Sequence, residues 1–198
     1  TCFKLDGSFA MEEHKNIESI FQHIWKSICN GKKNRHSEFH TFSLATCHQN
    51  VVKNRTVVLR GYDEERGIII FHTNIFSEKI LDIKKNDNVE CLFYSKKNKV
   101  QIRFSGTAFI NHNDNVCREK WNQMSDQSKL CYFQNINPGS TIRKPDDIEQ
   151  NLQDEMSKAF VIITVYIKKT DWLYLSHSGH KRVKFFDNKV NSGIWIAP

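Results

Sequence analysis

The stretch NRTVVLRGYDEERGIIIFHTNIFSEKILDIKKN, residues 54–86, decides the fold and raises the functional question. Two runs rich in β-branched residues, RTVVLRGY and GIIIFHT, flank the polar DEER, which predicts a β-hairpin. SEKILDIKKN then predicts a short helix with Ser77 as its N-cap and Glu78 in its first turn. Neither element needs a cation at its start, yet Arg55 opens the first predicted strand and Lys79 begins the helix.

A bound phosphate group would account for these cations. Arg and Lys provide positive charge, while hydroxyls and the amides of a helix N-terminus provide oriented donors. The stretch supplies Arg55, Lys79 and the hydroxyls of Thr73 and Ser77. Because the strand of Arg55 is expected to pair with the strand that ends at Thr73, the hairpin would bring these groups together. The alternative is that they are ordinary surface residues, since Arg and Lys are common there.

The neighbouring residues predict further elements. Apolar residues recur at spacings of three and four within 12–31, which indicates an amphipathic helix that Gly31 would end. A strand is expected over 39–47, and NVECLFYS and KVQIRFSGTAFI predict a second hairpin with KKNK as its turn. Residues 39–111 would form the first half of a barrel.

The remainder of the chain predicts helices and then strands. Residues 112–157 form a predicted helical insert with the patterns DNVCREKWNQM and SDQSKLCYF, and the polar DIEQNLQDEMSKA is compatible with helix or irregular chain. Residues 159–198 supply three closing strands, FVIITVYIKKTDWLYL, KRVKFF and GIWIAP. Hairpins with short helices between them indicate a mostly β fold with α-helices, an antiparallel sheet curled into a barrel with peripheral helices. The length favours one domain over 1–198.

Composition narrows the classes of partner. The formal net charge of +7 is compatible with nucleic acid, an anionic membrane surface or a phosphorylated ligand. The cations are spread along the chain, so no nucleic-acid binding is expected. No window approaches about 18 consecutive apolar residues, so no membrane span is expected. The first 14 residues lack a basic region followed by an apolar run, which argues against a signal peptide.

The six cysteines include no C-x-x-C pair. Most of them lie in apolar stretches, where a free thiol behaves as a small hydrophobic group. We therefore expect reduced thiols, a cytoplasmic protein and no zinc site. His177 and His180 form an H-x-x-H pair without a nearby carboxylate or cysteine, which favours polar turn residues over a metal site.

Three motifs together resemble a known family. They are R-x-V-x-L from Arg55, T-N-x-x-S-x-K from Thr73 and QIRFSGTA from Gln101, followed by a tryptophan-bearing helix, PGS and the closing strands. In this order they make residues 39–198 resemble the pyridoxamine 5′-phosphate oxidase superfamily. The resemblance implies an FMN-binding split β-barrel, a homodimer with the flavin at its interface, and an oxidoreductase acting on a small molecule. The W…M…PG arrangement looks more like the members of unassigned substrate than the vitamin B6 enzyme.

The resemblance also implies a set of flavin-site residues. Arg55 would bind the phosphate, and backbone groups of its strand would lie near the ring. Ser77 and Lys79 would complete the phosphate cup, and Gln101 would reach across the dimer interface. The full set of implied cofactor residues is Arg55, Thr56, Val57, Val58, His72, Thr73, Ser77, Lys79, Gln101, Trp172 and Lys184.

Several positions depart from the family pattern. Glu78 stands where the vitamin B6 oxidase has Arg, and Pro138-Gly139 replaces a Gln-Ser pair. The flavin-contacting Trp of the oxidase aligns with Leu173, so Trp172 would serve only by a one-residue shift. Lys184 replaces a C-terminal Arg.

The substrate side departs further. Of the Tyr, Arg and Ser that grip the substrate phosphate in the oxidase, only Ser128 remains, and Met124 replaces the Arg. The R-x-H motif becomes HKR, from His180 to Arg182, and Arg60 could compensate in part. We therefore expect substrate contacts from Arg60, Ser128, His180 and Arg182, and no efficient oxidation of pyridoxine phosphate.

Two other functions remain open. One is a flavin-binding module without turnover, and the other is a haem-handling protein that would use His177 or His180 as a ligand. No residue presents itself as a required acid or base. His72 is compatible with a structural role or with a donor near the flavin, and Trp121 with the core or with a lid, the core being favoured.

Overall fold

The computed structural model describes residues 16–198, so Cys2 and the predicted helical residues 12–15 lie outside the described residues. Ordered along the chain, the elements are α2 (Ile17–Lys33), β1 (Thr41–His48), β2 (Val51–Asp63), β3 (Ile68–Asn74), α3 (Glu78–Lys85), β4 (Asn88–Ser95), β5 (Val100–His112), α4 (Asn115–Asn122), α5 (Asp126–Leu130), a 3₁₀ turn (Pro145–Asp147), β6 (Phe160–Tyr174), β7 (Lys181–Phe186), a second 3₁₀ turn (Val190–Ser192) and β8 (Ile194–Trp195). None of the described helices is long and apolar enough to cross a membrane.

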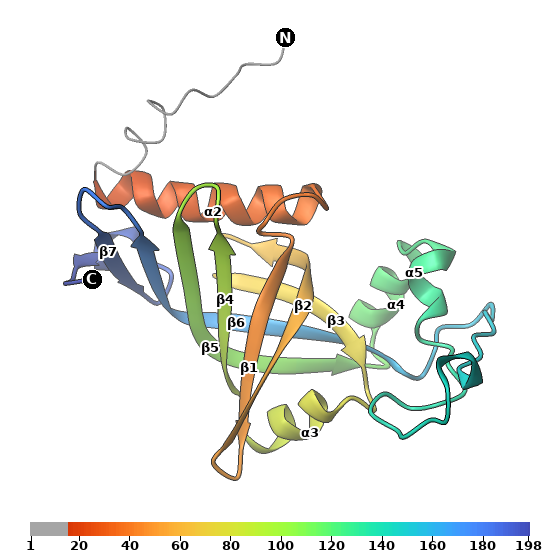
Figure 1. Ribbon diagram of the computed structural model, residues 1–198. Helices are drawn as coiled ribbons and strands as arrows, with labels where there is room; N and C mark the ends of the chain where they lie inside the picture. The colour runs from red at the N-terminus through yellow and green to blue at the C-terminus, as the bar shows by residue number, and fades with distance from the viewer. Residues whose placement is uncertain (1–15) are drawn as a thin grey trace.

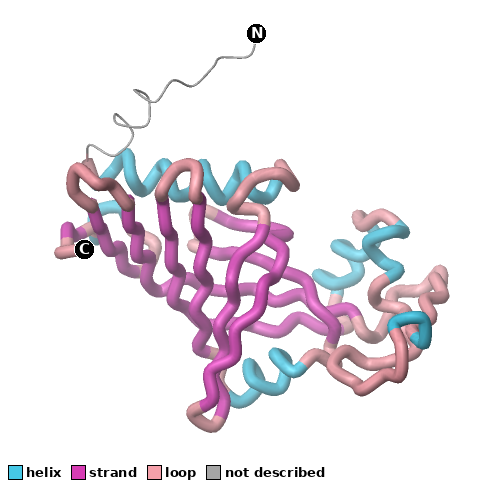
Figure 2. The backbone as a smooth tube through the Cα atoms, in the orientation of Figure 1, coloured by secondary structure: helices cyan, strands magenta, loops and turns pink. Residues whose placement is uncertain are grey.

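Six antiparallel strands close a barrel, as the hairpin pattern predicted. The strand order is β3-β2-β1-β4-β5-β6, and β6 pairs with β3 to complete the ring, while β7 and β8 extend the sheet beyond β6. The first half of β6 pairs with β3 and the second half with β7, so the sheet divides along this strand. Figures 1 and 2 show α2 across one end of the barrel, α3 at the opposite end, and α4 and α5 beside it.

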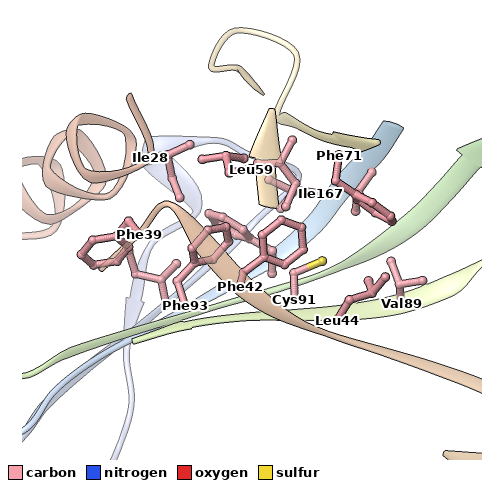
Figure 3. Packing of buried hydrophobic residues seen from close by; sticks show 14 of the residues in the cluster. Ile28, Phe39, Phe42, Leu44, Leu59, Phe71, Val89, Cys91, Phe93 and Ile167 are labelled. Carbon is pink, nitrogen blue, oxygen red and sulfur yellow. The ribbon is translucent and has the colours of Figure 1, made fainter. Parts of the chain in front are cut away.

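Alternating side chains of the strands fill the barrel. Figure 3 shows Phe42, Phe71 and Phe93 meeting inside it, and all three are buried. Phe42 lies edge-on to Phe71 and stacks on Phe93, with ring centroids 5.9 and 4.8 Å apart. The apolar stripe of α2 covers one end of this core, where Trp25 stacks on Phe104. The aromatic residues of the amphipathic pattern are therefore core, as expected.

Gly31 does not end the first helix, contrary to the sequence expectation. The helix continues to Lys33, and Asn34 is its C-cap. Gly31 is buried, and a Cβ there would collide with the backbone carbonyl of Phe39. The glycine thus permits the segment before β1 to pass close to the helix rather than terminating it.

Arg55 does not open its strand either. A tight turn at Gln49 and Asn50, with φ of 51° and 61°, joins β1 to a β2 that begins at Val51. Two consecutive residues with positive φ suit a hairpin turn. Arg55 therefore lies inside the strand, opposite Leu44 of β1.

The insert is less helical than its sequence suggested. Helices α4 and α5 form, but DIEQNLQDEMSKA contains no α-helix and is largely irregular. Trp121 of α4 is buried against Phe160 and Tyr132, so its assignment to the core is confirmed. The five cysteines in the described part of the chain are unpaired.

Candidate functional site

The four predicted phosphate-binding residues gather where β2, β3 and α3 meet. Lys79 Nζ donates a hydrogen bond to Thr73 Oγ1 at 3.0 Å, and Thr73 Oγ1 lies 3.2 Å from Ser77 Oγ. Burial lowers the pKa of Lys79, and the positive charge of Arg55 lowers it further. The positive charges of Arg55 and Lys79 are therefore close enough to affect one another. We call Arg55, Thr73, Ser77 and Lys79 the cup.

The N-terminus of α3 opens into the cup. Ser77 occupies the N-cap position, as predicted, but its side chain makes no cap hydrogen bond. Its hydroxyl donates instead to Asn74 O at 2.7 Å. The amides of the first helical turn are thus left without a side-chain acceptor from the cap residue, and such amides favour an anion.

The charges of the cup suit a phosphate group. Lys79 forms no ion pair with a carboxylate within the described residues, although Glu78 lies next to it in sequence and raises its pKa slightly against the two lowering causes. Two cations, two hydroxyls and a helix N-terminus are the donors that a phosphate dianion requires. The residues present therefore fit the phosphate of FMN.

Arg55 is held in place by groups that the sequence did not reveal. Its Nη1 donates to Thr46 Oγ1 at 2.7 Å and to Leu44 O at 3.3 Å, and its Nη2 lies 3.6 Å from Asp82 Oδ2. Thr46 in turn donates to Asp82 Oδ2 at 2.7 Å. A lone Thr on a strand and an Asp four residues after Glu78 give little sequence signal, because their partnership depends on the packing of α3 under β1.

The remaining residues of the β2 motif divide between two faces. Strand alternation puts Arg55 and Val57 on the core side, where Val57 packs against the core. Thr56 and Val58 lie on the outer face, opposite Ser43 and Thr41. Because neighbouring side chains point to opposite faces, the residues from Arg55 to Val58 can all contact one ligand only through their backbone groups.

His72 precedes Thr73 on β3 and lies on the opposite face of that strand, in an apolar setting. Its ring is edge-on to Phe160 at 5.1 Å, and its buried Nε2 has no hydrogen-bond partner in the described residues. Burial lowers the pKa of His72 to about 3, with help from the charges of Arg60 and Lys120. The imidazole is therefore neutral at neutral pH.

Three other predicted flavin residues lie elsewhere in the sheet. Gln101 is on β5, whereas Arg55 is on β2, and the strands β1 and β4 separate them. Lys184 of β7 is on the outer face and lines a hollow of about 340 Å³ together with Arg103 and Asp171. Trp172 is 0% exposed and packs in the core, and its contact with a flavin stays a prediction. The outer-face residue is Leu173, opposite Gln101.

The predicted substrate residues are not gathered around one point. Arg182 forms a bidentate ion pair with Asp171, in which Nε donates to Oδ1 at 2.9 Å and Nη2 donates to Oδ2 at 2.8 Å. His180 Nδ1 accepts a hydrogen bond from Ser176 N at 3.0 Å, in the exposed loop between β6 and β7. Ser128 Oγ lies 3.0 Å from Ser125 Oγ in α5. Of the four, only Arg60 is an exposed cation without an ion-pair partner in the described part of the chain.

The histidines of the β6–β7 loop do not form a buried ligand site. His177 and His180 are both exposed. In residues 16–198, no three His, Cys, Asp or Glu side chains gather in a way that could hold a metal ion.

Comparison with known proteins shows which proteins the chain is similar to. Residues 19–112 match the family described as pyridoxamine 5′-phosphate oxidase, FMN-binding domain. The chain is 41% identical over 70 residues to a pyridoxine/pyridoxamine 5′-phosphate oxidase of Psychrobacter cryohalolentis and 40% identical over 70 residues to that of Psychrobacter arcticus. Each match covers 35% of this chain and 32% of the relative, so the chain matches about a third of the length of these relatives.

Solved structures share the fold over most of the chain. A pyridoxamine 5′-phosphate oxidase-related, FMN binding protein from Nostoc punctiforme has a TM-score of 0.73 at 21% identity, over 89% of this chain and 96% of that one. PhzG from Burkholderia lata, in complex with tetrahydrophenazine-1-carboxylic acid, has a TM-score of 0.69 at 16% identity, over 98% of both chains. These identities show the fold alone. The sequence match over residues 19–112 and the shared fold make the chain similar to pyridoxamine 5′-phosphate oxidase-like FMN-binding proteins.

Proposed function

We propose that the chain is a single FMN-binding split-barrel domain that acts as an oxidoreductase on a small molecule. The observation that carries this proposal is the cup, in which Arg55 and Lys79 lie within one another's field beside the uncapped N-terminus of α3. Bound FMN would supply the redox chemistry, because the flavin ring accepts and donates electrons. The unpaired cysteines support a reducing compartment such as the cytoplasm.

The residues of the chain would divide the work of holding the cofactor. Arg55 and Lys79 would neutralise the phosphate, while Thr73 and Ser77 would orient its oxygens. His72, on the other face of β3, would stay neutral, because burial keeps its pKa far below neutrality. Phe160 and the neighbouring aromatic residues would exclude water from that face of β3.

A homodimer is part of the proposal. Gln101 and Lys184 face outward on β5 and β7, and two strands separate β5 from the strand of Arg55. A second copy could bring such outer-face residues to the cup of the first. The exposed Tyr94, Ile194 and Trp195 on the same sheet provide apolar surface for such a contact.

The substrate is not expected to be pyridoxine phosphate. Its phosphate would need fixed cations, and an unpaired buried phosphate costs several kcal/mol. Arg182 is already bound to Asp171, and Met124 packs in the apolar cluster around Trp121. Of the four expected substrate residues, Arg60 is the one cation without an ion-pair partner in the described residues, which supports a substrate with less demand for positive charge.

Titration with FMN tests the proposal. Flavin fluorescence should be quenched on binding, and Arg55→Ala and Lys79→Ala should each raise the dissociation constant by roughly tenfold to a hundredfold, since a charge-assisted hydrogen bond is worth about 1.5–3 kcal/mol. Lys96→Ala, in the exposed β4–β5 turn, removes the same charge elsewhere and should leave the constant unchanged. Equal affinity in all three variants would place the phosphate site elsewhere.

A further inference from the structure

Four charged side chains of alternating sign lead from the exposed start of α3 to Arg55. Lys53 Nζ lies 2.5 Å from Glu78 Oε1 and 3.5 Å from Asp82 Oδ1, and Arg55 Nη2 lies 3.6 Å from Asp82 Oδ2. The side chain of Glu78 is 65% exposed and that of Asp82 only 2%. We call Glu78, Lys53, Asp82 and Arg55 the ion-pair chain.

Asp82 is the buried centre of the ion-pair chain. Burial alone would raise its pKa, but the hydrogen bond from Thr46 and the charges of Lys53 and Arg55 outweigh this effect, and the pKa is lowered overall. The carboxylate is therefore ionised at neutral pH. A buried carboxylate is tolerated only with such partners, so Asp82 constrains the positions of both cations.

Thr46 transmits this constraint to Arg55. Its single hydroxyl hydrogen goes to Asp82 Oδ2, so its oxygen can only accept from Arg55 Nη1. With Leu44 O as a second acceptor, Nη1 is held against β1. The Nε and Nη2 groups of Arg55 form no hydrogen bond within the described residues and can donate to a ligand.

The negative charge of Glu78 at the start of α3 opposes anion binding, and Lys53 pairs with that charge. Glu78 is the first residue of α3, so its carboxylate competes with any anion for the positive end of the helix. Its contact with Lys53 pairs this charge and holds it on the β2 side. The three cations Lys53, Arg55 and Lys79 and the two carboxylates Glu78 and Asp82 leave a net formal charge of +1 around the cup.

We infer that Lys53 is a positioning residue of the cup, which pairs with Glu78 and braces Asp82 so that a phosphate group meets a net positive site. This inference rests on the proposed binding of FMN. Without Lys53 the same set of side chains would be neutral overall. Removing the charges of both Lys53 and Glu78 would restore +1, so the two substitutions should compensate one another.

The test compares FMN with riboflavin, which lacks the phosphate. Fluorescence titrations would cover the wild type, Lys53→Met, Glu78→Gln and the double variant. Lys53→Met should weaken FMN binding about tenfold, which corresponds to about 1.4 kcal/mol, and should leave riboflavin binding unchanged. Glu78→Gln should bind FMN at least as tightly as the wild type, and the double variant should recover wild-type affinity to within about threefold.

Lys84→Met is the matched control, because it removes one positive charge from the exposed last turn of the same helix. It should change FMN affinity by less than about twofold. The inference is overturned if Lys53→Met binds FMN as well as the wild type, if it loses riboflavin equally, or if the double variant stays as weak as Lys53→Met. Failure of the wild type to bind FMN would instead refute the proposed function, and the inference with it.

Discussion

Replacing His72 by phenylalanine should make the protein less sensitive to mild acid. The imidazole lies edge-on to Phe160 with its Nε2 buried, and burial together with the charges of Arg60 and Lys120 lowers its pKa to about 3. In the unfolded chain the pKa of a histidine is about 6.5. At a pH between these two pKa values, His72 binds a proton in the unfolded chain but not in the folded protein, so acid favours unfolding.

The sign and size follow from this difference. The contribution of His72 to stability is complete above pH 6.5 and decreases as the pH falls below it. At pH 5 the loss is about 1.5 pH units multiplied by about 1.4 kcal/mol per unit, or roughly 2 kcal/mol. His72→Phe removes the titrating group, keeps an aromatic ring against Phe160, and should not show this loss.

Urea-induced unfolding at pH 7.5 and pH 5 measures the effect. Between the two pH values, the wild type should lose roughly 2 kcal/mol more in free energy of unfolding than His72→Phe does. His177→Gln, in the exposed β6–β7 loop, should behave like the wild type. If His72→Phe and the wild type lose the same amount, the buried imidazole is not the source of acid sensitivity.

Three further predictions concern the sheet and the substrate. Asp171→Asn leaves Arg103 and Arg182 without their shared carboxylate and should lower the free energy of unfolding by about 3 kcal/mol in urea titrations; no change would show that the pairs are dispensable. Gly106→Ala should prevent or strongly weaken folding, seen as loss of the cooperative thermal transition, because its Cβ would meet the carbonyl oxygen of Tyr166 at the bulge in β5; a wild-type melting temperature would contradict this. The FMN-loaded protein should oxidise pyridoxine phosphate with a kcat/KM below about 10⁴ M⁻¹s⁻¹, followed through the Schiff base of the product, and a higher value would show that the substrate site is rebuilt from other residues.

Local patterning was sufficient for most of the fold. β-Branched runs separated by polar turns predicted the hairpins, because a strand's hydrogen bonds and turn chemistry are encoded nearby in sequence. The turn at Gln49 and Asn50 escaped notice because Gln is an unusual residue there. Gly31 was misinterpreted because a glycine that avoids Phe39 and a glycine that ends a helix look alike in sequence.

The cup was predictable because its residues are close in sequence, within one hairpin and the helix that follows. The groups that hold Arg55 were not, because Thr46 and Asp82 meet only when α3 packs under β1. The choice between Trp172 and Leu173 meets a related limit. Strand register decides which of two neighbours faces the core, and a one-residue shift exchanges the faces.

The visible absorption spectrum of the purified protein, followed by identification of the ligand released on denaturation, tests the central claim most directly. We predict flavin absorption bands and FMN as the released molecule, because the cup offers one phosphate site and the sequence has no G-x-G-x-x-G fingerprint for a dinucleotide. A Soret band, FAD, or a protein that retains no flavin after incubation with FMN would contradict the account.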